Sequence, residues 1–111
     1  MIFSFVLSCS DIIEVEDISN KTITVLAPMD ETVLNTTTVN FTWDSIEDAE
    51  DYKLQIATPS FENAIQILTD STLLTTNFSK TLETGSYEWR IRAENSSYET
   101  EYSTQSFTIE E

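Results

Sequence analysis

Residues 87–94 alternate strictly between apolar and polar side chains, and this period of two constrains the fold more than any other feature. The apolar positions are Tyr87, Trp89, Ile91 and Ala93, and a charged residue follows each of them. Successive side chains of a strand point to opposite faces, so the pattern predicts a strand with one buried and one solvated face. No window of the chain shows a sustained helical stripe.

Shorter runs of the same alternation divide residues 21–111 into seven predicted strands. Pro28 and Pro59 end two of them, because proline lacks the N–H that a sheet ladder needs. The predicted strands cover residues 21–27, 37–43, 52–58, 65–69, 74–82, 87–94 and 102–109. Short strands at fairly even spacing predict an all-β fold, here a seven-stranded antiparallel β-sandwich of two sheets.

The inward positions of these strands define the expected core. Lys80 is the misfit, because strict alternation with Phe78 and Leu82 would turn its charge inward. Either a β-bulge at this point or a lysine that snorkels at the rim of the sandwich would accommodate it. The expected core residues are Val25, Val39, Phe41, Trp43, Tyr52, Leu54, Ile56, Ile67, Phe78, Leu82, Tyr87, Trp89, Ile91, Phe107 and Ile109.

Three segments together resemble a fibronectin type III domain, which is an immunoglobulin-like sandwich. They are Phe41-Thr42-Trp43, residues 52–56 (Tyr-Lys-Leu-Gln-Ile) and residues 82–93 (Leu-Glu-Thr-Gly-Ser-Tyr-Glu-Trp-Arg-Ile-Arg-Ala). The resemblance covers residues 21–111 and implies that Trp43 anchors the core. It also implies that Leu82, Gly85 and Tyr87 form the tyrosine corner of that family, with a turn one residue shorter than usual. The last segment looks like the short form found in surface lipoproteins of Bacteroidota.

The charge and composition of the chain exclude several functions. Its 20 Asp and Glu residues against five Lys and Arg give a formal net charge of −15. Such a field repels phosphate backbones, so we expect no nucleic-acid partner. The chain has no histidine, which removes Ser-His-Asp catalysis and His-ligated metal sites. Its single cysteine allows no intrachain disulfide, and we expect no cofactor.

The first eight residues are apolar and uncharged, and a cysteine follows them. They are too few to span a bilayer, which needs about 20 residues, but they match the apolar part of a secretory signal peptide. Val6-Leu7-Ser8-Cys9 resembles the lipobox of bacterial lipoproteins, which implies that Cys9 is acylated and becomes the mature N-terminus. A complete signal peptide opens with a basic segment. A leader truncated at its start and an apolar first strand with a buried cysteine therefore both remain open.

Residues 10–17, directly after the cysteine, are strongly acidic. They resemble the export signals that carry Bacteroidota lipoproteins to the outer face of the outer membrane, and a solvated linker would have the same composition. We expect three parts: a lipoprotein signal peptide over 1–8, an acidic tether over 9–20 and the fibronectin type III-like sandwich over 21–111. A lipid anchor would make the membrane a partner and place the protein on the surface of the outer membrane.

Three of the five basic residues fall on outward positions of two predicted strands. Lys53, Arg90 and Arg92 would share the outer face of one sheet with Gln55. With Tyr98, an aromatic residue expected at an exposed turn, they form a candidate recognition face for an acidic glycan or a partner's carboxylate. Cross-strand charge pairing on a solvated face explains the same residues without a ligand.

Acidic and hydroxyl residues offer further candidate sites. Five carboxylates crowd the 44–51 loop, where calcium binding and plain solvation are the alternatives. Asp44-Ser45-Ile46 and Asp70-Ser71-Thr72 resemble the O-glycosylation triplet of Bacteroidota, which implies modification of Ser45 and Ser71. Close carboxylate pairs can hydrolyse glycosides, but nothing in the sequence builds a deep cleft, so we expect no catalytic residues.

These features predict a non-enzymatic outer-membrane lipoprotein. Its fibronectin type III-like domain would serve binding or assembly at the cell envelope, with a glycan or a protein as the partner. One alternative is a structural spacer or adhesin subunit whose sheet edge pairs with another protein. The other is a carboxylate-dependent glycan hydrolase.

Overall fold

The computed structural model describes residues 15–110, and every regular element in that range is a β-strand. The strand bounds are β1 Val25–Ala27, β2 Thr32–Leu34, β3 Thr38–Trp43, β4 Asp51–Thr58, β5 Gln66–Leu73, β6 Asn77–Thr81, β7 Gly85–Glu94 and β8 Ser103–Ile109. Within residues 15–110 there is no helix of the length and apolarity that crossing a membrane requires.

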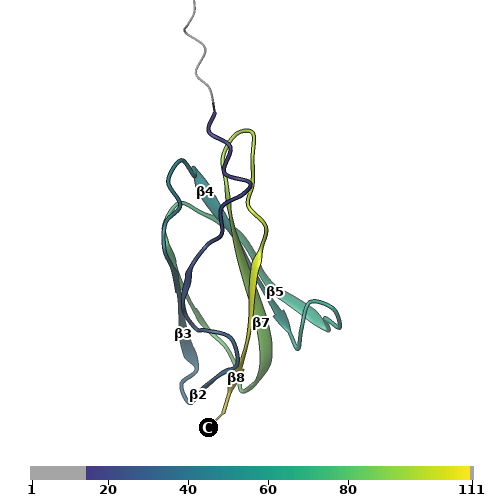
Figure 1. Ribbon diagram of the computed structural model, residues 1–111. Helices are drawn as coiled ribbons and strands as arrows, with labels where there is room; N and C mark the ends of the chain where they lie inside the picture. Colours follow the sequence, from purple (N-terminus) through teal and green to yellow (C-terminus); the bar gives the residue numbers. More distant parts are fainter. Residues whose placement is uncertain (1–14, 111) are drawn as a thin grey trace, which may run out of the picture.

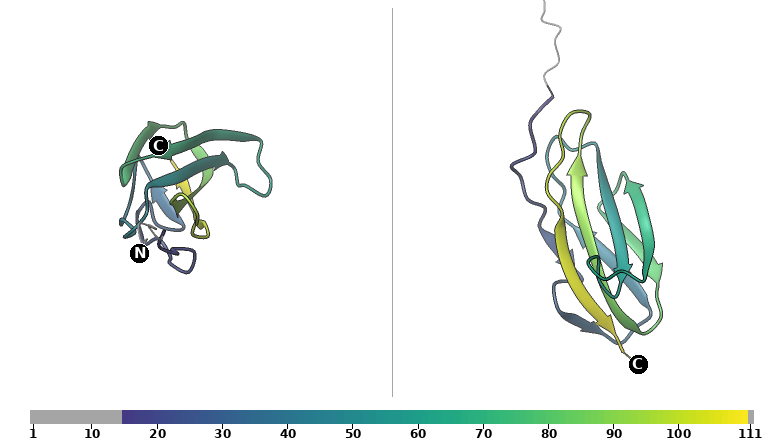
Figure 2. Two further views of the ribbon diagram at one scale, coloured as in Figure 1. Left: turned by 90° about the horizontal axis from the view of Figure 1, so that it is seen from above. Right: turned by 90° about the vertical axis from the view of Figure 1, so that its right-hand side faces the viewer.

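The strands form two sheets that pack face to face (Figures 1 and 2). β1, β3 and β6 make a three-stranded sheet, and β2, β8, β7, β4 and β5 make a five-stranded sheet in that order. The predicted all-β sandwich is confirmed, with one strand more than expected. This strand, β2, runs parallel to β8, whereas every other pairing between strands is antiparallel in the described range.

The core is built around two tryptophans and a phenylalanine from β3 and β7. The rings of Phe41 and Trp89 meet edge to face with centroids 5.0 Å apart, and Trp43 lies 6.2 Å from Trp89. Aromatic pairs of this kind contribute about 0.5–1.5 kcal/mol beyond the area that they bury. The expected core residues that are buried are Val39, Phe41, Trp43, Tyr52, Leu54, Ile56, Leu82, Tyr87, Trp89, Ile91, Phe107 and Ile109.

The other three expected core residues behave differently. Ile67 is 50% exposed, so its assignment to the core is wrong. The register of β4 and β5 shifts between Ile56 and Ala57, which leaves Leu68 as an extra residue on β5. This bulge takes Ile67 out of the alternation on which the prediction rested. Val25 and Phe78 are partly buried against the core.

Ile18 and Ile23 extend the core beyond the predicted set. Ile18 is fully buried and Ile23 is 3% exposed, so core packing begins inside the 9–20 range that was assigned to the acidic tether. Asn95 holds this segment, because its Nδ2 donates to the carbonyls of Glu16 at 2.9 Å and Asp48 at 3.2 Å. The segment enters the sandwich at the end opposite to the C-terminus (Figure 1).

The turn between β6 and β7 has the tyrosine corner that the resemblance implied. The hydroxyl of Tyr87 donates to the carbonyl of Glu83 at 2.6 Å. Gly85, the only glycine of the chain, has a backbone φ of 152°, a value that residues other than glycine rarely adopt. The glycine therefore permits the chain to enter β7 directly from the corner.

Lys80 sits on β6 without any local distortion. The register of β3 and β6 is uninterrupted and places Lys80 opposite Val39, so no bulge forms there. Its side chain is half-buried and lines an open groove beside β5. Of the two alternatives, the lysine at the rim of the sandwich is the correct one.

Candidate recognition surface

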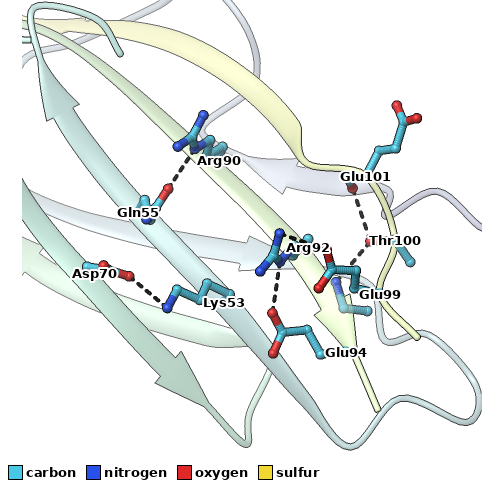
Figure 3. A network of polar contacts seen from close by, with 10 residues as sticks. Lys53, Gln55, Asp70, Arg90, Arg92, Glu94, Glu99, Thr100 and Glu101 are labelled. Carbon is cyan, nitrogen blue, oxygen red and sulfur yellow. Dashed lines mark hydrogen bonds and ion pairs between the residues drawn. The ribbon is translucent and has the colours of Figure 1, made fainter. Parts of the chain in front are cut away.

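The outer face of the five-stranded sheet brings four of the five predicted recognition residues together (Figure 3). β4 and β7 pair so that Gln55 lies opposite Arg90 and Lys53 lies opposite Arg92. Their sequence neighbours on both strands are buried, so the alternation of the strands turns these four side chains outward.

Arg90 is held by two aromatic rings and one hydrogen bond. Its guanidinium contacts two rings, 4.1 Å from the centroid of Phe61 and 4.4 Å from that of Tyr102. Its Nε donates to Gln55 Oε1 at 2.7 Å, while the backbone N–H of Phe61 donates to Glu88 Oε1 at 2.9 Å. None of the carboxylates in residues 15–110 forms an ion pair with Arg90. The guanidinium is thus fixed in place while its Nη groups lack an anionic partner in the described chain.

Arg92 is instead neutralised by two carboxylates. Its Nε lies 2.8 Å from Glu94 Oε2, and its Nη1 lies 3.3 Å from Glu99 Oε2 (Figure 3). Partial burial acts to lower the pKa of Arg92, but the hydrogen bond to Glu94 and the neighbouring negative charges outweigh it and raise this pKa. Arg92 therefore already has the partners that Arg90 lacks.

Lys53 pairs with Asp70 of β5, with 3.2 Å between Nζ and Oδ1. Hydrogen bonds from Lys53 and Gln55 lower the pKa of Asp70 below its ordinary value. Gln55 lies between two charged groups, because its Oε1 accepts from Arg90 and its amide helps to lower the pKa of Asp70. The ion pair is solvent-accessible, and such pairs contribute about 0–1 kcal/mol to stability.

One end of this face carries a poorly satisfied carboxylate. Asp51 lies opposite Glu94, and its Oδ1 is buried without a hydrogen-bond partner among the described residues. Burial raises the pKa of Asp51, and the nearby Glu94 carboxylate raises it further. In residues 15–110, the 44–51 loop included, no three or more acidic, cysteine or histidine side chains are grouped to hold a metal ion.

Tyr98 is not part of this arrangement. It lies in the turn between β7 and β8, where its carbonyl accepts a hydrogen bond from the Asn95 backbone N–H, and its side chain is 37% exposed. The ring that contacts both arginines belongs to Tyr102. The register of the β7–β8 hairpin is the signal that could have found it, because Ile91 pairs with Ser103 and the next residue on each side is Arg92 or Tyr102.

The two serines of the glycosylation triplets differ in their surroundings. Ser45 is exposed in the loop between β3 and β4. Ser71 is half-buried on β5 and lies opposite Leu54, whose side chain is in the core, so Ser71 is on the inner face of the sheet. Cys9, the predicted lipidation site, lies outside the described residues.

Comparisons with known proteins give the fold. No family model matches the chain, and no curated protein matches it. Among solved structures, the chain is similar to the fibronectin(III)-like modules of CbhA from Clostridium thermocellum. The TM-score is 0.58 at 8% identity, over 80% of this chain and 96% of that one.

Two further solved structures agree with this assignment. The fibronectin type III domain of the human KIAA0970 protein matches with a TM-score of 0.56 at 16% identity, over 78% of this chain and 72% of that one. A Fn3-like protein from Clostridium thermocellum matches with a TM-score of 0.53 at 18% identity, over 81% and 90% of the two chains. The chain therefore has a fibronectin type III-like fold.

Proposed function

We propose that this protein is a non-enzymatic lipoprotein of the outer membrane that presents its fibronectin type III-like domain for binding at the cell envelope. The lipobox-like residues 6–9 and the acidic stretch after them support the anchor. The fold supports a non-enzymatic binding role, because fibronectin type III domains are generally binding or spacer modules without catalysis. Acylation of Cys9 would hold the domain at a membrane surface without a spanning segment.

The binding role rests on one observation, the fixed guanidinium of Arg90. A guanidinium offers a planar fork of donors that matches a carboxylate, and the Nη groups of Arg90 have no carboxylate partner within residues 15–110. Contacts with Phe61 and Tyr102 hold the guanidinium in place, so the Arg90 side chain loses little conformational entropy when a ligand binds. The ligand that fits is the carboxylate of an acidic sugar, such as a uronic acid.

The net charge of the chain restricts which acidic glycans bind. At −15 the protein repels anions at long range, and physiological salt screens this repulsion beyond about 8 Å. A glycan with one carboxylate at the Arg90 fork therefore gains the contact with little repulsion elsewhere. We expect short, sparsely charged glycans to bind more tightly than polyanionic ones.

The binding test compares Arg90→Gln with Arg92→Gln, a matched control whose guanidinium already has two partners. Titration calorimetry would use glucuronic-acid disaccharides, neutral disaccharides and acidic peptides. We expect Arg90→Gln to weaken uronate binding at least about tenfold, since a hydrogen bond to a charged group contributes about 1.5–3 kcal/mol. Equal effects of the two variants, or no uronate binding, would reject the glycan role, and binding of acidic peptides alone would reassign the ligand to a protein.

The anchor has its own test, the intact mass of the protein isolated from its native envelope. A mass equal to residues 9–111 plus acyl chains is the expected result, and mass added at Ser45 or Ser71 would reveal glycosylation. Cys9→Ala should move the protein to the soluble fraction, whereas Ser10→Ala should not. Membrane retention of Cys9→Ala would contradict the anchor while leaving the Arg90 test unaffected.

A second candidate function is the structural spacer or adhesin subunit that pairs with a protein through a sheet edge. The observation that favours it is the long, exposed edge at β5.

A further inference from the structure

On one side of the sandwich, the last strand of each sheet, β6 and β5, has no further strand paired with it in the described residues. Among residues 15–110, β5 pairs only with β4 and β6 pairs only with β3, so each strand leaves one edge of its ladder open there. The start of β5 and the end of β6 border an open groove of about 450 Å³, lined by Gln66 and Leu68, by Lys80 and Thr81, and by the turn that follows β6, with Glu83. β5 stands at the margin of the molecule (Figures 1 and 2).

The β5 edge carries one of the protections that natural sheet edges use, a bulge near its start, and lacks the others. Such edges are short, or bear lysine or proline, or are twisted away by a bulge. β1 and β2 have three residues each, and β6 has five with Lys80 among them. β5 has eight residues without lysine or proline, and its one charge, Asp70, is paired with Lys53. Its bulge at Leu68 still leaves residues 69–73 in regular register.

Large apolar side chains flank this edge at both ends. Ile65 is 87% exposed and Ile67 is 50% exposed before and at the start of β5, and Leu74 is 82% exposed directly after it. These exposed side chains would give a strand added at this edge an apolar contact near each of its ends. Residues 69–73, which keep regular register, span about 13 Å at roughly 3.3 Å per residue, and the exposed apolar residues lie just beyond both ends of this stretch.

We propose that β5 accepts an extended strand of a partner protein, which joins the five-stranded sheet by β-augmentation. This inference deepens the second candidate function, and it does not rest on the proposed carboxylate site, because the backbone pairing uses the edge of the sheet. The added strand would lie over the groove between β5 and β6. Its backbone would pair with β5, while its inward side chains would pack on Leu68 and its outward side chains would face the same solvent as Asp70.

The charges around the β5 edge determine which partner strands fit it. Residues 58–74 carry Glu62 and Asp70 and no basic residue, and the whole chain has a net charge of −15, which attracts a cationic segment. Lys80 and Glu83 line the groove with opposite charges, so uncharged side chains fit best at the inward positions. The fitting strand therefore alternates uncharged apolar residues facing the groove with Lys or Arg facing outward. A second copy of this chain would instead bring two bodies of −15 together, which disfavours a symmetric dimer.

The test uses a ten-residue peptide of alternating valine and lysine, with a lysine–proline decapeptide of equal charge as the control that cannot pair. Both would be titrated into the ¹⁵N-labelled protein and followed by amide chemical shifts and hydrogen exchange. We expect only the valine peptide to shift and protect amides of β5. Equal binding of both peptides, no binding, or protection at β6 instead would overturn the proposal, as would a β5-mediated dimer of the free protein.

Matched lysine substitutions locate the contact. Ile67→Lys and Leu74→Lys change the β5 edge, whereas Val33→Lys makes the same charge change on β2, at the other edge of the same sheet, where Val33 is 61% exposed. Ile67 pairs with Ala57 on the outer face of the sheet, and alternation places Leu74 on the same face as Asp70. We expect each β5 variant to weaken the valine peptide about tenfold or more, because the apolar stems of the peptide's outward lysines lose a contact and like charges meet. Val33→Lys should leave the affinity within about threefold. Equal losses at both edges would show general electrostatic attraction and refute the assignment.

Discussion

Replacement of Ile18 by alanine tests whether the folded domain begins before residue 21. Ile18 is fully buried although its neighbours Asp17 and Ser19 are exposed. Truncation of a buried isoleucine to alanine costs about 2–5 kcal/mol, because apolar transfer is lost and a cavity remains. A residue of a solvated tether would change the stability by no more than about 0.5 kcal/mol. The two alternatives therefore predict losses in the free energy of unfolding that differ at least fourfold, about 2 kcal/mol for a core residue against 0.5 kcal/mol for a tether residue.

Differential scanning calorimetry and urea denaturation would measure this difference. For a domain of 60–100 residues, 1 kcal/mol shifts Tm by about 4–8 °C, so Ile18→Ala should lower Tm by about 8 °C or more. Ile65→Ala is the matched control, because it removes the same atoms from a side chain that is 87% exposed. A decrease for Ile18→Ala no larger than that of the control would refute the claim that this segment packs in the core.

Three other changes probe single interactions. The pKa of Asp51 is raised by burial and by Glu94, so the carboxyl favours folding only while protonated. Asp51→Asn should therefore raise Tm at pH 7. This gain in Tm should disappear below the ordinary carboxyl pKa of 3.8. Calorimetry that shows no gain in Tm at pH 7 would contradict this reasoning. Tyr87→Phe removes the 2.6 Å hydrogen bond to Glu83 and should cost about 0.5–1.5 kcal/mol by urea denaturation; a neutral result would mean that the corner adds no stability. Asn95→Ala should speed hydrogen exchange at residues 16–20, and an unchanged rate, equal to that of a Ser96→Ala control, would show that the side chain does not hold the segment.

β7 and β4 could be predicted from the sequence because one side of each is buried against the core, whereas β5 extends four residues beyond the predicted 65–69 strand. In β7, Tyr87, Trp89 and Ile91 are buried and the residues between them are not, as the alternation required. The predicted strand at 52–58 differs from β4 by a single residue. The same alternation also placed Lys53, Gln55, Arg90 and Arg92 on one outer face before any register was known, since a face needs only the parity of each position.

Other features depend on three-dimensional pairing and gave no local signal. β2 has three residues, too few for a period, and it is held by β8 from the far end of the chain. Ile67 lies outside the core because a bulge inserts one extra residue into β5, which changes the face of the sheet on which the neighbouring positions lie. The contact between Phe61 and Arg90 depends on the path of the 59–64 loop across the sheet, which no pattern in those residues specifies.

The parallel pairing of β2 with β8 also determines how the domain responds to a pull on its two ends. The N-terminal segment and the C-terminus lie at opposite ends of the sandwich (Figure 1), and β1 shares only two register pairs with β3. Once β1 detaches, tension draws β2 and β8 in opposite directions along their common axis. Their ladder extends from the Glu31 N–H on the Ser106 carbonyl to the Glu110 N–H on the Leu34 carbonyl. These bonds are strained together in shear rather than opened one after another, so this short strand acts as a mechanical clamp for the domain.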